Sequence, residues 1–143
     1  MNGLMSTVTL KRFILFFFAV FMLSGCITPA GQLTHEDFGW KTVKTKYDFQ
    51  ESFRRMNTGF RKCGQFVAEG NVYNDNKTAQ IDLYFKAAFG GRSDWVAGRV
   101  DIAADGTGSV VNLGLIQRMS AIKEDHPFLL SWATYLNDTY ECN

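Results

Sequence analysis

Residues 79–87 read AQIDLYFKA, and apolar side chains at every second position alternate there with polar ones. A period of two is typical of a β-strand with one face in the core and the other in water. Residues 96–102, VAGRVDI, repeat this alternation, and strand character also extends over residues 40–47, 66–73 and 109–116. The middle of the chain therefore predicts a β-sheet.

The connections between these strands are short and rich in Asn, Asp and Gly, which favour tight turns. They lie at residues 74–77, 90–93 and 105–108. Short connections favour neighbouring strands that run antiparallel, so we expect a meander of four to five strands.

A helical period replaces the alternation in residues 49–63, where apolar side chains recur at i, i+4, i+7, i+11 and i+14. These side chains are Phe49, Phe53, Met56, Phe60 and Cys63. Asp48 is placed to cap this helix with Glu51 as its capping-box partner, and Gly64 is placed to end it. A stripe of this kind is more typical of a core-facing helix than of a ligand cradle.

A second helix is expected to begin near Pro127, a residue that suits the first helical position, with Asp125 or His126 just ahead of it. The apolar face of this helix would comprise Phe128, Leu129, Trp132, Tyr135 and Leu136. We therefore predict an α+β fold, in which an N-terminal and a C-terminal helix pack on one face of the antiparallel sheet.

The amino-terminal residues have the organisation of an export signal. Lys11 and Arg12 precede an apolar run at residues 13–23, FILFFFAVFML, which the small residues Ser24 and Gly25 follow. Eleven residues form a helix of about 16 Å, too short to span a hydrocarbon core of about 30 Å. The pattern therefore favours a removable signal peptide over a spanning helix.

Leu23-Ser24-Gly25-Cys26 resembles the lipobox of bacterial lipoproteins. The resemblance implies that the Cys26 thiol receives diacylglycerol, that cleavage follows Gly25, and that fatty chains such as palmitate then anchor the protein in a membrane. The layout of the remaining chain, with Trp132-Ala133 and a late cysteine, also resembles small proteobacterial lipoproteins.

These expectations divide the chain into a signal peptide at 1–25, a lipidated tether at 26–39 and a single globular domain at 40–143. Ile27 stands where an aspartate would resemble the inner-membrane retention signal of Gram-negative lipoproteins. We therefore expect the protein to be held in the bacterial envelope, at the outer membrane and facing the periplasm.

Export to an oxidising compartment makes Cys63 and Cys142 a candidate disulfide, since no other pairing is possible once Cys26 carries lipid. The two cysteines are too far apart in sequence for a C-x-x-C redox centre. The expected role of the bond is to hold the carboxyl terminus against the first helix.

Charge is nearly balanced over the whole chain, at +1, so bulk attraction to nucleic acid is not expected. Basic residues gather on the first helix, opposite its apolar stripe, and are Arg54, Arg55, Arg61 and Lys62. This basic face is a candidate contact for an anion or an acidic partner, and the alternative is a solvated helix face.

No set of residues predicts catalysis, since the chain has only two histidines, His35 and His126, and none of the common catalytic motifs. His35, Glu36 and Asp37 are more typical of a solvated loop than of a metal site, and no cofactor is expected. The prediction is a non-enzymatic binding or envelope-assembly lipoprotein with a possible envelope protein partner. The alternatives are a lipid or small-molecule carrier and a protein that resembles lysozyme inhibitors in size and location.

Overall fold

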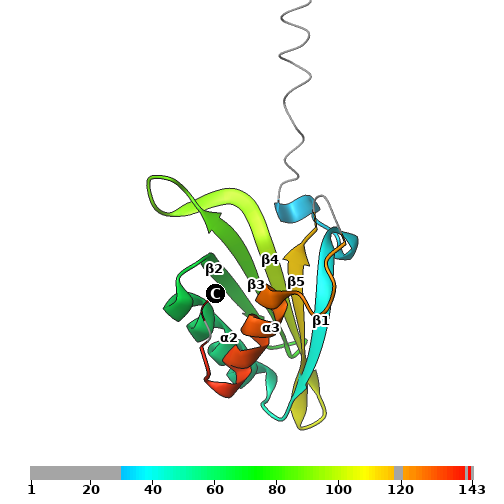
Figure 1. Ribbon diagram of the computed structural model, residues 1–143. Coiled ribbons are helices and arrows are strands. Elements are labelled where there is room, and N and C mark those ends of the chain that lie inside the picture. Colours follow the sequence, from blue (N-terminus) through cyan, green and yellow to red (C-terminus); the bar gives the residue numbers. More distant parts are fainter. Residues whose placement is uncertain (1–29, 118–120, 141, 143) are drawn as a thin grey trace, which may run out of the picture.

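The computed structural model describes residues 30–117, 121–140 and 142 of the 143-residue chain. Five strands form one antiparallel sheet in the order β1-β5-β4-β3-β2 (Figure 1). The strands are β1 (Phe38–Thr45), β2 (Val67–Tyr73), β3 (Thr78–Lys86), β4 (Arg92–Asp105) and β5 (Gly108–Ile116). The helices are α2 (Phe49–Cys63), α3 (Pro127–Thr134) and the short 3-10 helices η1 (Ala30–Gln32), η2 (His35–Asp37) and η3 (Tyr135–Asn137).

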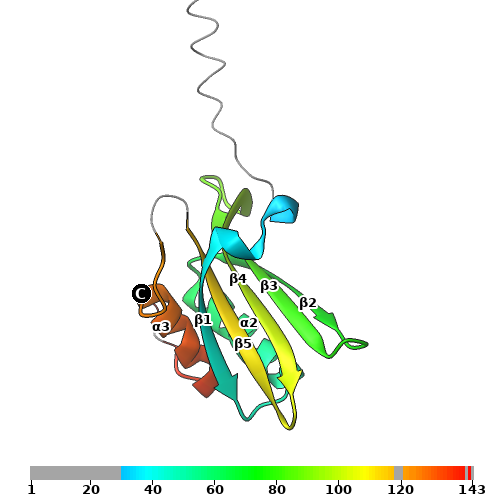
Figure 2. The same ribbon diagram turned by 90° about the vertical axis from the view of Figure 1, so that its right-hand side faces the viewer.

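Strands β2 to β5 form the predicted meander, and β5 returns to pair with β1. Helix α2 therefore connects the two edges of the sheet, because β1 and β2 lie at opposite ends of the strand order. Both α2 and α3 lie on the same side of the sheet, and Figure 2 shows the strands in front with α2 behind them. The predicted α+β fold, with two helices on one face of an antiparallel sheet, is confirmed.

The main core lies between the sheet and the two helices. Met56 and Phe60 of α2 are buried there, as predicted from the helical stripe. Trp132 of α3 is also buried, and its ring centroid lies 5.3 Å from that of Phe60 in an edge-to-face contact. Tyr135 contacts Phe60 in the same way at 5.3 Å. Aromatic side chains thus fill the space between the helices and the sheet.

The ends of α2 follow the sequence signals in most respects. The Asp48 side chain accepts a hydrogen bond of 2.8 Å from the backbone N–H of Glu51, which satisfies one of the free donors at the helix start. Gly64 adopts φ = 64°, a left-handed conformation that glycine reaches at little cost, and ends the helix. The Glu51 carboxylate does not complete a capping box and instead binds the arginines of the next turn.

The predicted alternation holds along β3 but is wrong at Val96 and Ala97 of β4. Ala79, Ile81 and Leu83 are buried against the helices, but the pairing with β4 shifts at Leu83/Tyr84. Leu83 pairs with Gly98 and Tyr84 with Val96, so Ala97 is an extra residue of β4. Ala97 is buried in the main core, whereas Val96 is buried with Tyr84 in a second cluster on the other face. Phe85 stays on the helix side, where its ring contacts Phe66 at 5.8 Å, and is 43% exposed. The β-bulge at Ala97 explains why Val96 lies on the face opposite to the one predicted, since one extra residue in a strand reverses the faces of the residues on one side of it.

The second cluster lies under the segment that precedes β1. It contains Phe38, Tyr84 and Val96, with Leu33 packed against it. Residues 30–39, which the sequence analysis assigns to the tether, thus form ordered structure. The Trp40 indole N–H donates to the His35 backbone carbonyl at 2.8 Å. The Gln117 side-chain amide donates to the Glu36 backbone carbonyl at 2.9 Å. The sequence analysis missed this order because two 3-10 helices carry no long periodic pattern.

The predicted disulfide joins Cys63, the last residue of α2, to Cys142, with their Cα atoms 5.1 Å apart. The bond closes a loop over a sequence separation of 79 residues. It holds the carboxyl-terminal end of the chain against the end of the first long helix, as predicted.

Candidate functional site

No helix of the described residues covers the middle of the sheet on the face away from α2 and α3. Register places five polar residues side by side across all five strands on this face. They are Asn71, Gln80, Asp101, Asn112 and Thr42, in the order β2-β3-β4-β5-β1, and we call them the polar row. Each lies at a position that alternates with core residues of its strand, so the polar row belongs to the face away from α2 and α3.

Part of the polar row is held by hydrogen bonds between strands. Thr42 donates from its hydroxyl to the Asn112 side-chain oxygen at 2.8 Å. In the neighbouring row, the Arg99 guanidinium binds the Asp82 carboxylate at 2.7 Å, and the Gln80 amide donates to both oxygens of that carboxylate at 3.2 Å. These contacts fix the orientation of the Gln80 and Asn112 side chains.

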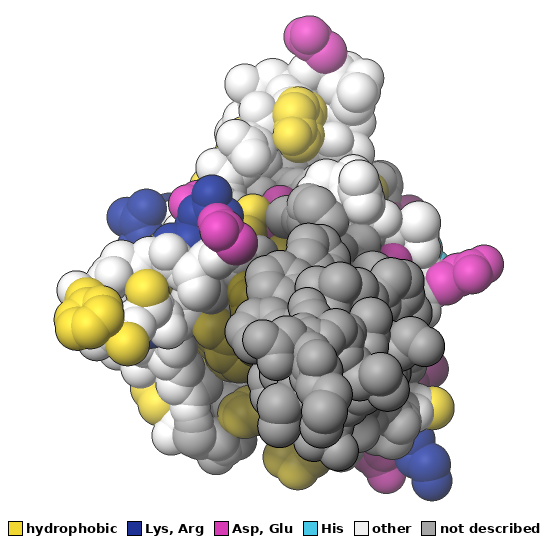
Figure 3. Space-filling model, turned by 90° about the horizontal axis from the view of Figure 1, so that it is seen from above, with side chains coloured by type: hydrophobic (Ala, Val, Ile, Leu, Met, Phe, Trp, Pro, Cys, Tyr) yellow, Lys and Arg dark blue, Asp and Glu magenta, His cyan; other side chains and the backbone are white. Residues whose placement is uncertain are grey.

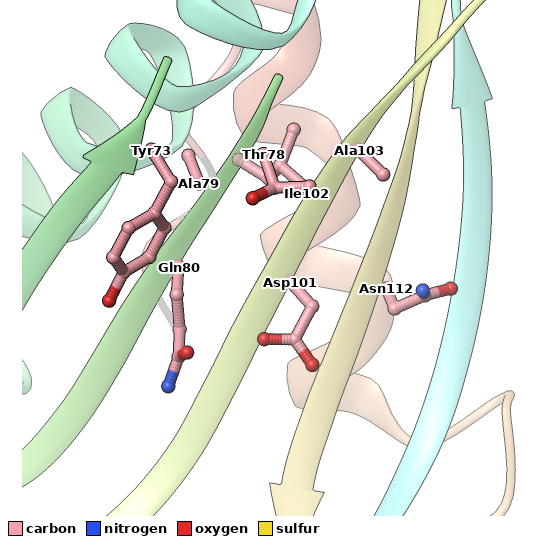
Figure 4. Close-up of a pocket in the computed structure, with 8 residues that line it drawn as sticks. All are labelled: Tyr73, Thr78, Ala79, Gln80, Asp101, Ile102, Ala103 and Asn112. Atoms are coloured by element: carbon pink, nitrogen blue, oxygen red, sulfur yellow. The ribbon is translucent and has the colours of Figure 1, made fainter. Parts of the chain in front are cut away.

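A pocket of about 250 Å³ opens over the polar row. Figure 4 shows Tyr73, Gln80, Asp101 and Asn112 projecting from the sheet on the side away from the helices. Thr78, Ala79, Ile102 and Ala103 complete its lining. The Tyr73 ring is 48% exposed and forms one wall of this pocket.

Asp101 is the charged group of this pocket. Partial burial raises the pKa of its carboxyl group above the ordinary value, while the nearby Arg99 charge acts in the opposite direction. No hydrogen bond reaches the Asp101 carboxylate from the residues that the structure describes. The carboxylate is therefore available to accept hydrogen bonds from a bound group, and burial makes each of these bonds more valuable.

The polar side chains that line the pocket are of kinds that bind a ligand through hydrogen bonds. Carboxamide, hydroxyl and carboxylate groups line it together with apolar ones, and the described residues that line it include no histidine, cysteine or lysine. Over the described ranges, no group of three or more His, Cys, Asp or Glu side chains is placed to hold a metal ion. The arrangement suits recognition of a polar group that carries hydrogen-bond donors.

Sequence analysis did not single out the pocket residues, although it placed Gln80 and Asp101 on the polar side of their strands. The sequence does not show which residues of neighbouring strands lie opposite each other, that is, the register of the sheet. Alternation assigns each residue to a face, but only the pairing of Gln80 with Asp101 and of Asp101 with Asn112 brings the three together. A signal was present in the recurrence of carboxamide and carboxylate residues at the polar positions of consecutive strands.

The predicted basic face of α2 is largely engaged in internal contacts. Arg54 binds the Glu51 carboxylate through two hydrogen bonds of 2.6 and 2.7 Å. Arg55 binds the same carboxylate at 2.7 Å, Asp138 at 2.7 Å and the Leu136 carbonyl at 3.0 Å. The bonds from Arg54, with help from Arg55, lower the pKa of Glu51 to about 2. Arg55 thus joins α2 to the segment after α3.

The remaining two cations of the basic face are exposed at the end of α2. The Lys62 ammonium lies 4.3 Å from the centroid of the Tyr140 ring, a cation–π contact. Arg61 forms no ion pair with the described residues. The four residues of the basic face therefore do not converge on one anion site, and the geometry favours the solvated-face alternative for most of them.

The histidine segment before β1 is structural. The His35 ring stacks on Trp40 with centroids 4.5 Å apart. Asp37 accepts a hydrogen bond from the Thr34 backbone N–H at 2.6 Å, which closes the turn. His126 caps α3 by accepting from the Phe128 backbone N–H at 3.3 Å.

Cys26 and the rest of the expected export signal lie outside the described residues. Within the described residues, no helix combines the length and the apolar character needed to cross a membrane. No protein-family model, no curated protein and no solved structure matches the chain.

Proposed function

We propose that the chain is a membrane-anchored lipoprotein of the bacterial envelope, and that its domain faces the periplasm and binds a partner without catalysis. The observation that carries the binding role is the pocket over the polar row, in which Asp101 accepts no hydrogen bond from the described part of the chain. The lipobox-like residues 23–26 support the anchor. A domain held near a bilayer and open on one sheet face is suited to capture of an envelope protein.

The anchor is tested by growing cells with labelled palmitate. The label is expected on the wild type and absent from Cys26→Ala, because no other thiol of the lipobox is available to take diacylglycerol. The Cys63→Ala/Cys142→Ala variant is the matched control and is expected to keep the label. Label that persists on Cys26→Ala would refute the lipid anchor.

The binding role is tested by crosslinking in cells and recovery of the membrane-anchored form. Asp101→Arg is expected to remove a crosslinked partner that the wild type recovers, because a carboxylate that accepts donors becomes a bulky cation in the pocket. Asp125→Arg makes the same charge change in an exposed turn on the helix side and is expected to keep the partner. Circular dichroism checks that both variants are folded.

Two outcomes would contradict the proposal. If the wild type recovers no protein above background, the binding role is rejected. If Asp101→Arg recovers the same partner in the same amount as Asp125→Arg, the pocket is not the contact surface.

The carrier alternative finds little support in the packing of the main core. A Cβ atom added at Gly59 would lie 2.4 Å from the Tyr135 ring, and one added at Gly98 would lie 2.8 Å from Trp132. Such close approaches mean that side chains of the helices already fill the space against these backbones. A lipid carrier would need a cavity there. The inhibitor alternative rests on size and location alone.

A further inference from the structure

We propose that the β3–β4 connection, residues 87–91, is a second membrane contact that rests its apolar tip on the bilayer to which Cys26 is anchored. The inference depends on the proposed lipid anchor and goes beyond it, because it assigns the orientation of the domain on the membrane. The occupant of this surface is the lipid interface itself.

The tip of the connection is apolar and projects into solvent. Phe89 is 105% exposed, so its ring makes almost no contact with the domain. The turn beneath it is closed by backbone hydrogen bonds, from Ala87 to the Gly91 carbonyl at 3.2 Å and from Gly90 to the Ala87 carbonyl at 3.0 Å. Gly90 and Gly91 have φ angles of 89° and 76°, which L side chains rarely adopt. A tight turn therefore holds an aromatic ring away from the rest of the described chain.

The connection lies at the end of the domain where the chain arrives from Cys26. Helix η1 begins at Ala30 and contacts β4. Figures 1 and 2 place η1 and the β3–β4 connection at the same end of the sheet, and the β4–β5 turn at the opposite end. Figure 3 looks down on the first of these ends and shows hydrophobic side chains on its left rim, the side where Figure 1 has the connection.

The covalent distance from the anchor is short. Four Cα–Cα steps separate Cys26 from Ala30, and they span at most roughly 14 Å even when fully extended. Once Cys26 carries lipid, this end of the domain must lie near the headgroups. Aromatic rings favour that interface, because their apolar body enters the hydrocarbon boundary.

The charges beside the tip are balanced. Lys86 and Arg92 flank the connection, while Asp94 and Glu69 lie nearby, and Arg92 binds Glu69 at 2.9 Å. The contact is therefore expected to depend on the apolar tip and not on attraction to anionic lipid.

The test uses the full lipidated chain in phosphatidylcholine vesicles that contain brominated lipid, a contact quencher of tryptophan. Phe89→Trp reports on the tip, and Thr107→Trp, in the exposed β4–β5 turn, is the matched control. Emission is measured as the difference from the wild type, which removes the native tryptophans. The emission added by Phe89→Trp is expected to be quenched and blue-shifted, and that added by Thr107→Trp to be unchanged. Vesicles with added phosphatidylglycerol are expected to give the same result.

Vesicle flotation separates this inference from the proposed anchor. A protein that floats with the vesicles while Phe89→Trp is quenched no more than Thr107→Trp would overturn the hairpin contact and leave the anchor standing. A protein that does not float would overturn both. Quenching that requires phosphatidylglycerol would overturn the assignment to the apolar tip.

Discussion

Replacement of Trp132 by alanine is expected to lower the free energy of unfolding by about 3–5 kcal/mol. The side chain is 1% exposed and lies at the centre of the contact between the sheet and both helices. Its ring contacts Phe60, Phe66 and Phe128, with centroids 5.3, 5.8 and 6.3 Å away. Alanine would leave a cavity that these neighbours fill only in part, because α3 also packs against β5 and β1.

The measurement is urea unfolding of the domain without its lipid, followed by circular dichroism. Leu130→Ala is the matched control, because Leu130 belongs to the same helix but is 46% exposed, and a change within about 0.5 kcal/mol is expected for a surface position. If Trp132→Ala costs no more than Leu130→Ala, the position of α3 against the sheet is wrong.

The part of the fold that sequence predicts is the part determined by local periodicity. The stripe from Phe49 to Cys63 specifies both the extent of α2 and the face it buries. Alternation in 79–85 and 98–102 specifies the faces of β3 and β4. In each case a single segment contains the whole signal, because an amphipathic element must place its apolar side chains on one face.

Pairing between distant segments is not written in local periodicity. In the antiparallel pairing of β1 with β5, Phe38 lies opposite Ile116, and the sequence of neither strand indicates which strand it pairs with. The bulge at Ala97, opposite Leu83 and Tyr84, is likewise a property of two strands together, and it places Val96 on the face opposite to the one that alternation predicts. The pocket was missed for the same reason, since the polar row exists only after register is known.

Burial also changes the interpretation of charged residues. The basic face of α2 is a run of cations in the sequence, but Arg55 is bound by Glu51 and by Asp138, a residue 83 positions further along the chain. Because Asp138 is so far from Arg55 in the sequence, the charge pattern of the helix does not reveal this ion pair. The ion pairs reveal a helix surface used to hold the segment after α3, whereas charge counting suggested an anion site.

Loss of the disulfide is expected to lower the free energy of unfolding by about 2–4 kcal/mol. The Cys63→Ala/Cys142→Ala variant is the form to measure, because removal of both thiols prevents mispairing. The main reason lies in the unfolded chain, where a closed loop of 79 residues' separation has fewer conformations than the open chain. The folded domain should change little, since Arg55 and the α3 contacts still hold the carboxyl-terminal segment.

The slope of the unfolding free energy against urea concentration tests whether the disulfide acts on the unfolded chain. If the disulfide acts on the unfolded ensemble, the double variant should unfold to a more expanded chain. Its free energy of unfolding should then fall more steeply with urea concentration than that of the wild type. Reductant should lower the unfolding midpoint of the wild type to that of the variant and leave the variant itself unchanged. Equal stability of the two proteins under oxidising conditions would mean that the bond does not constrain the unfolded chain. The carboxyl-terminal segment would then depend on its ion pairs and buried aromatic contacts alone.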